Sequence, residues 1–485
     1  MTIKELKPGI VWNYFHELTR IPRPSKKEEK VIAYLLEFAK KHNLEAKKDE
    51  AGNVLIYKPA TKGMEHLPTV ILQGHVDMVC EKNRDTVHDF DNDPIETVID
   101  GDWLKAKGTT LGADNGVGVA AALAILASDD IQHSNLECLF TIDEETGLTG
   151  AYALGKDFLK GDILINLDTE EEGEVYIGCA GGKITTATFT YKKEDVPANY
   201  FWFRVEVKGL NGGHSGSEIH KGLGNANKIL NRYLWAMSRK YDFALAEIDG
   251  GNLHNAIPRE AYAIAGVPYG RKEDVIVEMN LLAPQIEAEL KAVDPKLEMT
   301  VKSTDTPSFV VDKDTTSNLL NAIYACPHGV LGMSHEIPGL VETSTNLASI
   351  KMKEGNTIVI TTSQRSSTDS LKDDAGNIIN AVFTLAKAEV KHSEGYPGWR
   401  PNPDSKVLAV AKKAYKDLFG KDAEIMAIHA GLECGLFLEK YPHLDMISCG
   451  PTIREAHSPE EKVQISSVDK WWVFLLEILK NIPAK

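Results

Sequence analysis

The stretch Thr69-Val70-Ile71-Leu72-Gln73-Gly74-His75-Val76-Asp77 passes from an apolar run directly into a histidine and an aspartate. A short apolar run of this kind is typical of a buried β-strand. The pattern recurs where residues 137–142 end at Asp143-Glu144-Glu145 and where residues 162–167 end at Asp168. Ligands of open α/β sheets bind at the carboxyl ends of the strands. These strand ends therefore predict a polar site at one edge of a parallel sheet.

Apolar residues at helical spacing alternate with these strands along the first part of the chain. They occur over residues 10–19, 27–42 and 117–127, and the prolines Pro22 and Pro24 separate the first two segments. Strands that alternate with helices are typical of an α/β domain whose sheet is largely parallel. We therefore expect a mixed, largely parallel central sheet that is flanked by helices.

The pattern changes near residue 186. Residues 201–207 alternate like an antiparallel strand with one exposed face, and residues 223–237 read as an amphipathic helix. Further strands are expected at 261–267, 297–301 and 357–362, and further helices at 272–293 and 376–390. We predict an inserted α+β domain over residues 186–390, which divides a first domain into residues 1–185 and 391–485.

The composition is that of a globular protein with an excess of acidic residues. The chain has 485 residues, of which 43% are hydrophobic, and this is ample for two cores. Its 54 lysines and arginines against 70 aspartates and glutamates give a net charge of −16. Such a charge repels phosphate backbones, so we expect no nucleic acid among the partners of this protein.

Several features predict a cytoplasmic location. Residues 1–20 lack the apolar stretch and cleavage site of a secretory signal, and no apolar run approaches the roughly 20 residues that span a membrane. The six cysteines are scattered and form no CxxC pair, which favours reduced thiols over disulfides or a zinc ribbon. We therefore expect neither a membrane partner nor an oxidising compartment.

The polar residues at the strand ends have both a structural and a functional interpretation. His75 and Asp77 are two apart on a strand, so they share a side, and one can bind a metal while the other orients it. Asp114, in Gly112-Ala113-Asp114-Asn115-Gly116, precedes a helix that a carboxylate commonly caps. The acids Asp143-Glu144-Glu145 repel one another unless they are solvated or a cation lies among them.

As a set, these residues fit a metal centre better than any of them does alone. The set offers two imidazoles and three carboxylates, from His75, Asp114, Glu145, Asp168 and His457. It suits two zinc ions that share one carboxylate, although manganese or cobalt would bind the same donors. Two such ions can turn a shared water into a hydroxide at neutral pH, and Glu144 beside them could take the proton of that water.

The segments around these residues resemble the co-catalytic di-zinc metallopeptidases, a family that includes carboxypeptidase G, aminoacylase and the carnosinases. The segments are Gly74-His75-Val76-Asp77, Gly112-Ala113-Asp114-Asn115-Gly116, Asp143-Glu144-Glu145-Thr146-Gly147, Asn166-Leu167-Asp168 and Ala456-His457-Ser458-Pro459. Further motifs look like those of the aminoacyl-histidine dipeptidases, also called Xaa-His or cytosolic nonspecific dipeptidases. They are Asn211-Gly212-Gly213-His214-Ser215-Gly216, Ile428-His429-Ala430-Gly431-Leu432-Glu433-Cys434-Gly435 and Ser448-Cys449-Gly450-Pro451.

The resemblance implies a role for each residue of the set. Asp114 would bridge two metal ions, Glu144 would be the general base, and Asp77 would orient the first histidine. The remaining ligands would be His75 and Asp168 in one metal site, and Glu145 and His457 in the other.

The inserted domain would be a lid in such enzymes. Its histidine, His214, would stabilise the oxyanion of the tetrahedral intermediate, unless it is only a loop residue. Arg365 could hold the α-carboxylate of the substrate and Asn255 could contact the peptide, although surface or turn roles suit both residues equally. We also expect a homodimer, in which the lid histidine acts within its own chain or across the interface.

The function that follows from the resemblance is hydrolysis of unblocked dipeptides, including Xaa-His types such as β-alanyl-histidine. Another di-metal amide hydrolase, such as a tripeptidase or an N-acyl-amino-acid deacylase, would use the same centre. An inactive metal-binding scaffold is a further alternative, but loss of the general base would be its signature and Glu144 is present.

Overall fold

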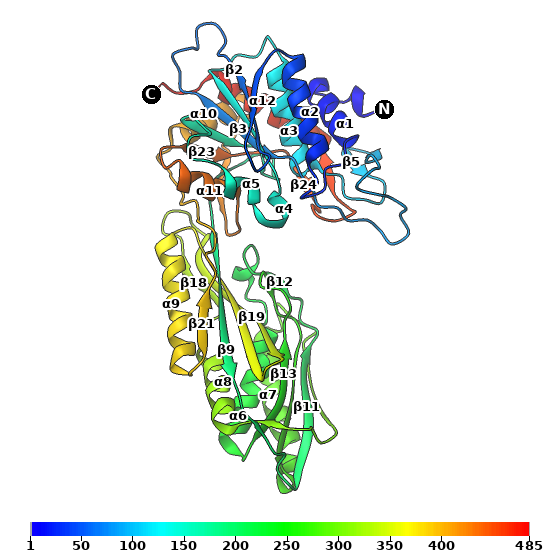
Figure 1. The fold of residues 1–485 in the computed structure, drawn as a ribbon, viewed down its shortest axis with the longest axis vertical. Coiled ribbons are helices and arrows are strands. Elements are labelled where there is room, and N and C mark those ends of the chain that lie inside the picture. Colours follow the sequence, from blue (N-terminus) through cyan, green and yellow to red (C-terminus); the bar gives the residue numbers. More distant parts are fainter. Residues whose placement is uncertain (1, 485) are drawn as a thin grey trace. The chain divides into compact units, whose positions relative to one another are not determined.

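The chain, seen here in a computed structural model that describes residues 2–484, forms two units (Figure 1). The second unit consists of Cys179–Gly398 together with Ile428–Gly431, and the rest of the described chain makes up the first. The predicted boundaries at residues 186 and 390 therefore lie inside the second unit. The reason is that strand β9 (Gly181–Thr190) begins before the first boundary, while its partner β21 (Glu389–His392) ends after the second.

The first unit is built on an eight-stranded sheet with the order β1-β2-β6-β3-β7-β23-β8-β22. Its strands are β1 (Glu45–Lys48), β2 (Val54–Lys58), β3 (Val70–His75), β6 (Leu136–Thr141), β7 (Ile163–Asn166), β8 (Glu174–Cys179), β22 (Glu424–Ile428) and β23 (Asp445–Ser448). The central strand β3 is parallel to β6 and to β7, and β7 is parallel to β23, whereas β1 and β2 extend the sheet in the antiparallel sense. The prediction of a mixed, largely parallel central sheet is confirmed.

Helices pack around this sheet, as the periodicity predicts. They are α1 (Gly9–Thr19), α2 (Glu29–Lys41), α3 (Ala113–Ala127), α10 (Lys406–Phe419) and α12 (Ile465–Lys480), with the short α4 (Glu144–Gly147), α5 (Thr149–Ala153) and α11 (Glu433–Lys440). Helix α3 contacts both β3 and α1, and its residues are buried as far as Leu126. Because its side chains beyond Asn115 are apolar on all sides, α3 is a core helix with no solvent face. Its first turn carries Asp114.

A smaller four-stranded sheet with the order β24-β25-β5-β4 holds the C-terminal segment in place. It consists of β4 (Thr97–Asp100), β5 (Trp103–Ala106), β24 (Ile453–Arg454) and β25 (Lys462–Gln464). Strands β24 and β25 pair with each other, and β25 also pairs with β5. The loop at 455–461, which carries His457, is therefore fixed at both of its ends.

The second unit has a nine-stranded sheet, of which eight strands follow the order β16-β11-β15-β13-β19-β20-β9-β21 while β18 pairs with β19. Besides β9 and β21, its strands are β11 (Tyr200–Lys208), β13 (Ala244–Gly250), β15 (Ala261–Pro268), β16 (Glu298–Ser303), β18 (Gly329–Met333), β19 (Val341–Lys353) and β20 (Thr357–Ser366). Its helices are α6 (Ala226–Lys240), α7 (Lys272–Leu290), α8 (Lys313–Ala325) and α9 (Asp369–Leu385). Side chains from the helices and the sheet share one large apolar core, so this unit has the predicted α+β character.

The helix predicted at residues 376–390 ends earlier than expected. Helix α9 stops at Leu385, because Lys387 adopts a left-handed φ of 64° that a continuous helix does not allow. The chain then enters β21 at Glu389.

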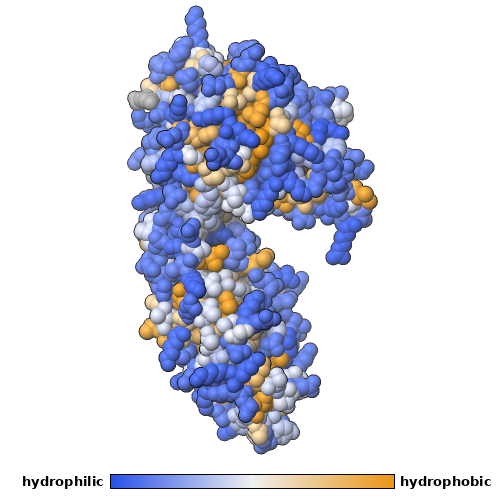
Figure 2. Space-filling model, in the orientation of Figure 1, coloured by the Kyte–Doolittle hydropathy of each residue, from blue (hydrophilic) through white to orange (hydrophobic). Residues whose placement is uncertain are grey.

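The surface is largely polar. Figure 2 shows a face of the molecule on which hydrophilic residues predominate, with smaller hydrophobic areas between them. Within residues 2–484, no helix combines the length and the apolar character needed to cross a membrane.

Candidate metal centre

Parallel strand pairing brings the ends of three strands, with the candidate residues that lie there, to one edge of the first unit's sheet. His75, at the end of β3, lies opposite Thr141 of β6, and the acids Asp143-Glu144-Glu145 follow directly. On the other side, β3 pairs with β7, which ends just before Asp168. Because these strands run in the same direction, their carboxyl ends meet, and the side chains that follow them can converge.

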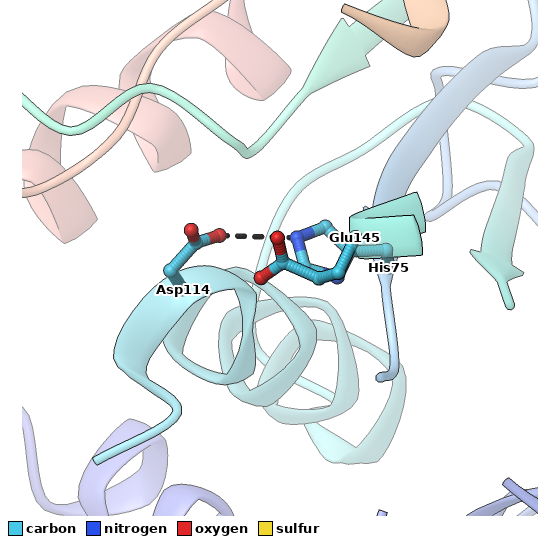
Figure 3. A group of neighbouring side chains, drawn as sticks. All are labelled: His75, Asp114 and Glu145. Carbon is cyan, nitrogen blue, oxygen red and sulfur yellow. Dashed lines mark hydrogen bonds and ion pairs between the residues drawn. The ribbon is translucent and has the colours of Figure 1, made fainter. Parts of the chain in front are cut away.

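Asp114 lies between the two histidines of the set. Its Oδ1 is 3.0 Å from His75 Nε2, and its Oδ2 is 3.1 Å from His457 Nε2. His75 Nε2 is also 3.4 Å from Asp168 Oδ1, and His457 Nε2 is 3.0 Å from Glu145 Oε2. Figure 3 shows His75 and Glu145 directed toward Asp114, which stands at the start of α3. Each oxygen of Asp114 therefore faces one pair made of a histidine and a carboxylate.

The electrostatics of the group favour added positive charge. Burial lowers the pKa of His75, but the carboxylates of Asp168 and Asp114 outweigh this effect and hold that pKa well above its usual value. Hydrogen bonds to Asp114 and Glu145 raise the pKa of His457 to about 11. Burial raises the pKa of Asp168 to about 6, although His75 opposes this shift. Both imidazoles thus attract a proton, because the carboxylates around them need a cation.

The donor set fits divalent cations. Ligand atoms of His75, Asp114 and Glu145 all lie within 4.8 Å of one another. Glu145 Oε1 is buried and has no hydrogen-bond partner, although buried carboxylate oxygens normally have one. An orphaned carboxylate oxygen beside imidazole nitrogens and further carboxylates suits zinc, manganese or cobalt.

Asp77 links His75 to the turn that carries the acids. Its Oδ1 lies 3.3 Å from His75 Nδ1, at ion-pair distance. The same carboxylate accepts hydrogen bonds from Ser25 Oγ at 2.7 Å and from the backbone N–H groups of Glu144 and Glu145 at 3.1 and 3.2 Å. Burial raises the pKa of Asp77, but the bonds from His75 and Ser25 outweigh it and keep the pKa low. Asp77 is therefore placed to fix the ring of His75 and the start of α4 together.

Glu144 begins the short helix α4 beside these groups. Asp143, which precedes it, has a left-handed φ of 48° and accepts hydrogen bonds from the hydroxyls of Thr146 and Thr149. Burial raises the pKa of Glu144 well above its usual value, and the nearby carboxylate of Asp168 adds to the shift while His75 opposes it. A carboxylate with a raised pKa is a better proton acceptor than one in water.

Glu433 belongs to a buried hydrogen-bond network next to the site. The sequence motif contains this residue but does not indicate its role. Its Oε2 accepts hydrogen bonds from Gln73 Nε2 at 2.6 Å and from Thr141 Oγ1 at 2.8 Å. Gln73 in turn accepts a bond from Asn166 Nδ2 at 2.6 Å. Burial raises the pKa of Glu433 to about 8, with His75 as the main opposing group. These bonds tie β6, β3 and β7 together close to their carboxyl ends.

The remaining three predicted site residues, His214, Asn255 and Arg365, belong to the second unit. His214 lies on β12 (Gly213–His214), which pairs with β14 (Ala256–Ile257). Its Nδ1 accepts backbone hydrogen bonds from Gly216 at 3.3 Å and Ser217 at 3.1 Å, so the ring proton of a neutral His214 is on Nε2. Burial lowers the pKa of His214, and the guanidinium of Arg365 lowers it further, so a neutral ring is favoured.

Arg365 lies on β20 and is only 6% exposed. Its Nη1 donates a hydrogen bond to Tyr396 Oη at 2.8 Å, while its Nε is buried and has no partner. His429 lies nearby, and its Nε2 is 2.7 Å from Ser344 Oγ. Burial and the charge of Arg365 lower the pKa of His429 to about 3. Arg365 is therefore a permanent cation whose Nε–H is available as a hydrogen-bond donor.

A cavity of about 630 Å³ on the same unit lies beside His214. Its lining includes His214, Asn255, Leu253, Ile257 and Pro258. Asn255 stands at its exposed part, and its backbone oxygen accepts a hydrogen bond from Ser215 N at 2.8 Å.

Comparison with known proteins identifies the family of the chain. Residues 71–481 match the model of peptidase family M20/M25/M40. The cytosol non-specific dipeptidase of Escherichia coli (strain K12) is 45% identical over 486 residues, which cover 100% of this chain and 99% of that protein.

Solved structures agree with the sequence comparison. The aminoacylhistidine dipeptidase from Vibrio alginolyticus has a TM-score of 0.93 and 44% sequence identity, covering 100% of this chain and 99% of that one. A tripeptidase from Staphylococcus aureus, with a TM-score of 0.57, 17% identity and coverage of 98% and 99%, shares the fold. The family model matches most of the sequence, and the two dipeptidases are similar to the chain over its whole length. This protein therefore belongs to peptidase family M20/M25/M40.

Proposed function

We propose that this chain is a metal-dependent dipeptidase that hydrolyses unblocked dipeptides, including Xaa-His types such as β-alanyl-histidine. The observation that carries the proposal is the position of Asp114, whose two oxygens each face a different pair of histidine and carboxylate. Support comes from the extended likeness to the cytosol non-specific dipeptidase and to the aminoacylhistidine dipeptidase.

The metal ligands are assigned by their distances. We assign His75 and Asp168 to one ion, His457 and Glu145 to a second, and Asp114 to both. Imidazole and carboxylate donors favour zinc, with manganese or cobalt as alternatives. Bound there, the ions would supply Lewis-acid activation of a water and of the scissile carbonyl.

Glu144 is assigned the proton transfers of the reaction. As general base it takes a proton from the attacking water, and as general acid it then delivers that proton to the leaving amine. Its backbone N–H is held by Asp77, which also lies at ion-pair distance from His75. Asp77 therefore positions the proton carrier and one metal ligand through a single carboxylate.

The second unit is assigned the recognition of the peptide. The Nε2–H of a neutral His214 can donate to the developing oxyanion, and Arg365 has a buried Nε that is free to bond the substrate's α-carboxylate. Asn255, with an exposed side chain beside the same cavity, is assigned to the peptide group. We infer that this unit acts as a lid on the catalytic unit and contributes to a homodimer, which light scattering of the purified protein tests.

The compartment is assigned from the cysteines and from the relative. None of the six cysteines, all of which the structure describes, forms a disulfide, and five of them are buried, which suits a reducing environment. The related Escherichia coli protein is described as a cytosol enzyme. We therefore place this protein in the cytoplasm.

Hydrolysis of a small panel, before and after chelation and zinc restoration, tests the proposed function. The panel is β-alanyl-histidine, alanyl-histidine, leucyl-glycine, a tripeptide and an N-acetyl amino acid. Metal-dependent cleavage of the free dipeptides alone is expected. Cleavage of only the tripeptide or the acetylated compound would overturn the substrate assignment, and the fold does not exclude this, because a tripeptidase shares it. No cleavage by a metal-loaded chain would indicate an inactive scaffold.

A further inference from the structure

Glu461 is a buried carboxylate that the sequence gives no reason to single out. Its side chain is 2% exposed, and no lysine or arginine is hydrogen-bonded to it among the described residues. Instead it accepts four backbone hydrogen bonds from consecutive residues of one turn. The donors are Leu111 N at 2.7 Å, Gly112 N at 2.9 Å, Ala113 N at 2.7 Å and Asp114 N at 3.3 Å.

Arg23, also 2% exposed, holds the same turn from the other side. Its Nη2 donates to Gly112 O at 2.5 Å, and its Nη1 donates to Val76 O and Asp77 O, both at 2.9 Å. A Cβ at Gly112 would lie 2.4 Å from this guanidinium, and one at Gly116 would lie 2.6 Å from it. The glycines on both sides of Asp114 are therefore required by the close approach of Arg23.

Glu461 also belongs to the loop that carries His457. That loop lies between β24 and β25, and Glu461 N closes it with a hydrogen bond to Ser458 O at 3.0 Å. His457 Nε2 reaches Asp114 Oδ2 at 3.1 Å, while the Glu461 side chain reaches the backbone of Asp114. The loop and the turn are thus joined twice, once through side chains at the centre and once through Glu461.

We propose that Glu461 and Arg23 are positioning residues that form a clamp around the 111–114 turn and set the distances between Asp114, His75 and His457. The four bonds to Glu461 fix the turn to the loop of His457, and the three bonds from Arg23 fix it to the end of β3. The clamp acts on the metal ligands assigned above, so it rests on the proposed function. Neither residue is assigned contact with the substrate.

The clamp predicts a loss of metal affinity when either half is weakened. In Glu461→Gln the amide keeps the size of the carboxylate but offers one acceptor oxygen, and its NH2 group meets two of the backbone donors. Groups that orient metal ligands typically change metal affinity or activity by about 10–100-fold when they are replaced. We expect a loss of this size in the affinity of the metal-free protein for zinc.

The experiment titrates metal-free protein with zinc in the presence of a competing chromophoric chelator. Glu461→Gln is compared with Glu460→Gln, which removes an exposed carboxylate from the same loop. The expected result is zinc binding about 10–100-fold weaker in Glu461→Gln and unchanged in Glu460→Gln. With zinc in excess, the KM of Glu461→Gln for alanyl-histidine should equal that of the wild type, because the residue acts only through the metal ligands.

Wild-type zinc affinity in a folded Glu461→Gln protein would overturn the proposal. If circular dichroism shows that this variant does not fold, Arg23→Lys decides, because lysine keeps the charge but cannot make the three bonds of the guanidinium. Weaker zinc binding by Arg23→Lys would then support the clamp, and unchanged binding would overturn it. Zinc binding as expected in a protein that cleaves no dipeptide would refute the proposed function and leave the clamp intact.

Discussion

Replacing Glu144 by glutamine is the most direct test of the assigned chemistry. The substitution keeps the size of the side chain, and the hydrogen bond from the backbone N–H of residue 144 to Asp77 remains. A glutamine cannot accept the proton of the attacking water. General acid–base groups contribute about 100- to 10,000-fold, so kcat should fall by this factor, which is about 3–5 kcal/mol of transition-state stabilisation.

The structure also predicts the effect of this substitution on stability. Burial and the carboxylates around Glu144 raise its pKa, so its ionised form is disfavoured in the metal-free native state. Removing the charge should therefore leave the metal-free protein as stable as the wild type or make it more stable. A large loss of activity combined with an unchanged or raised melting temperature would separate a catalytic role from a structural one.

Steady-state hydrolysis of alanyl-histidine, zinc content and thermal unfolding of metal-free protein together check this prediction. Glu439→Gln is the matched control, because Glu439 is an exposed residue of α11 in the same unit. A kcat within tenfold of the wild type at equal zinc content would refute the role of Glu144 as the base. A loss of zinc in Glu144→Gln would show instead that this carboxylate is a metal ligand.

Three further predictions concern other residues. Asp114→Ala should lose metal as well as activity, because it removes the carboxylate that both histidines face; elemental analysis that still finds two ions per chain would exclude the shared ligand. His214→Ala should lower kcat by about 100- to 1,000-fold at an unchanged melting temperature, and unaltered kinetics would remove His214 from the mechanism. In metal-free protein, burial raises the pKa of Glu433 to about 8. Because the unfolded chain loses this proton first, the free energy of unfolding should fall as pH rises from about 4 to about 8. Chemical denaturation should show that the free energy of unfolding falls less between about pH 5 and about pH 8 in Glu433→Gln than in the wild type. Equal decreases would contradict the raised pKa of Glu433.

Elements whose apolar residues recur at helical or strand spacing could be predicted from the sequence. The predicted helix at 272–293 begins with α7 (Lys272–Leu290), and the predicted strand at 261–267 matches β15 (Ala261–Pro268) closely. The sequence does not predict strand β19 (Val341–Lys353). Its residues are buried on both faces and include Thr, Ser and Asn, so apolar and polar residues do not alternate along it. The long sequence separation between β9 and β21 likewise left no local signal for the domain boundary.

Local sequence patterns likewise indicate some residues of the candidate site and not others. Three of the five predicted ligands, His75, Glu145 and Asp168, lie at or just after the ends of predicted strands, and the roles of all five remain predictions. Arg23 and Glu461 could not be found in this way, because their partners are backbone groups far away in the sequence. Burial of a charge depends on tertiary contacts, so neither composition nor spacing indicates it. The isolated match of Glu433 to a motif gave its position but not its hydrogen bonds to Gln73 and Thr141.

Three residues in the segments around the assigned metal ligands have a left-handed backbone, which Lys387 and five other non-glycine residues of the described chain also adopt. Asp143 has φ of 48°, Glu455 of 55° and His457 of 64°, all in the left-handed region that non-glycine residues rarely adopt. Such residues cost about 1–3 kcal/mol each and persist only where the surrounding structure holds them. Here Asp143 directly precedes Glu144, and the other two lie in the loop that Glu461 ties to the turn of Asp114. Hydrogen bonds from Thr146 and Thr149 hold Asp143, and the bonds of Glu461 hold the loop of His457, so the segments that carry the assigned base and one assigned ligand are fixed by their surroundings.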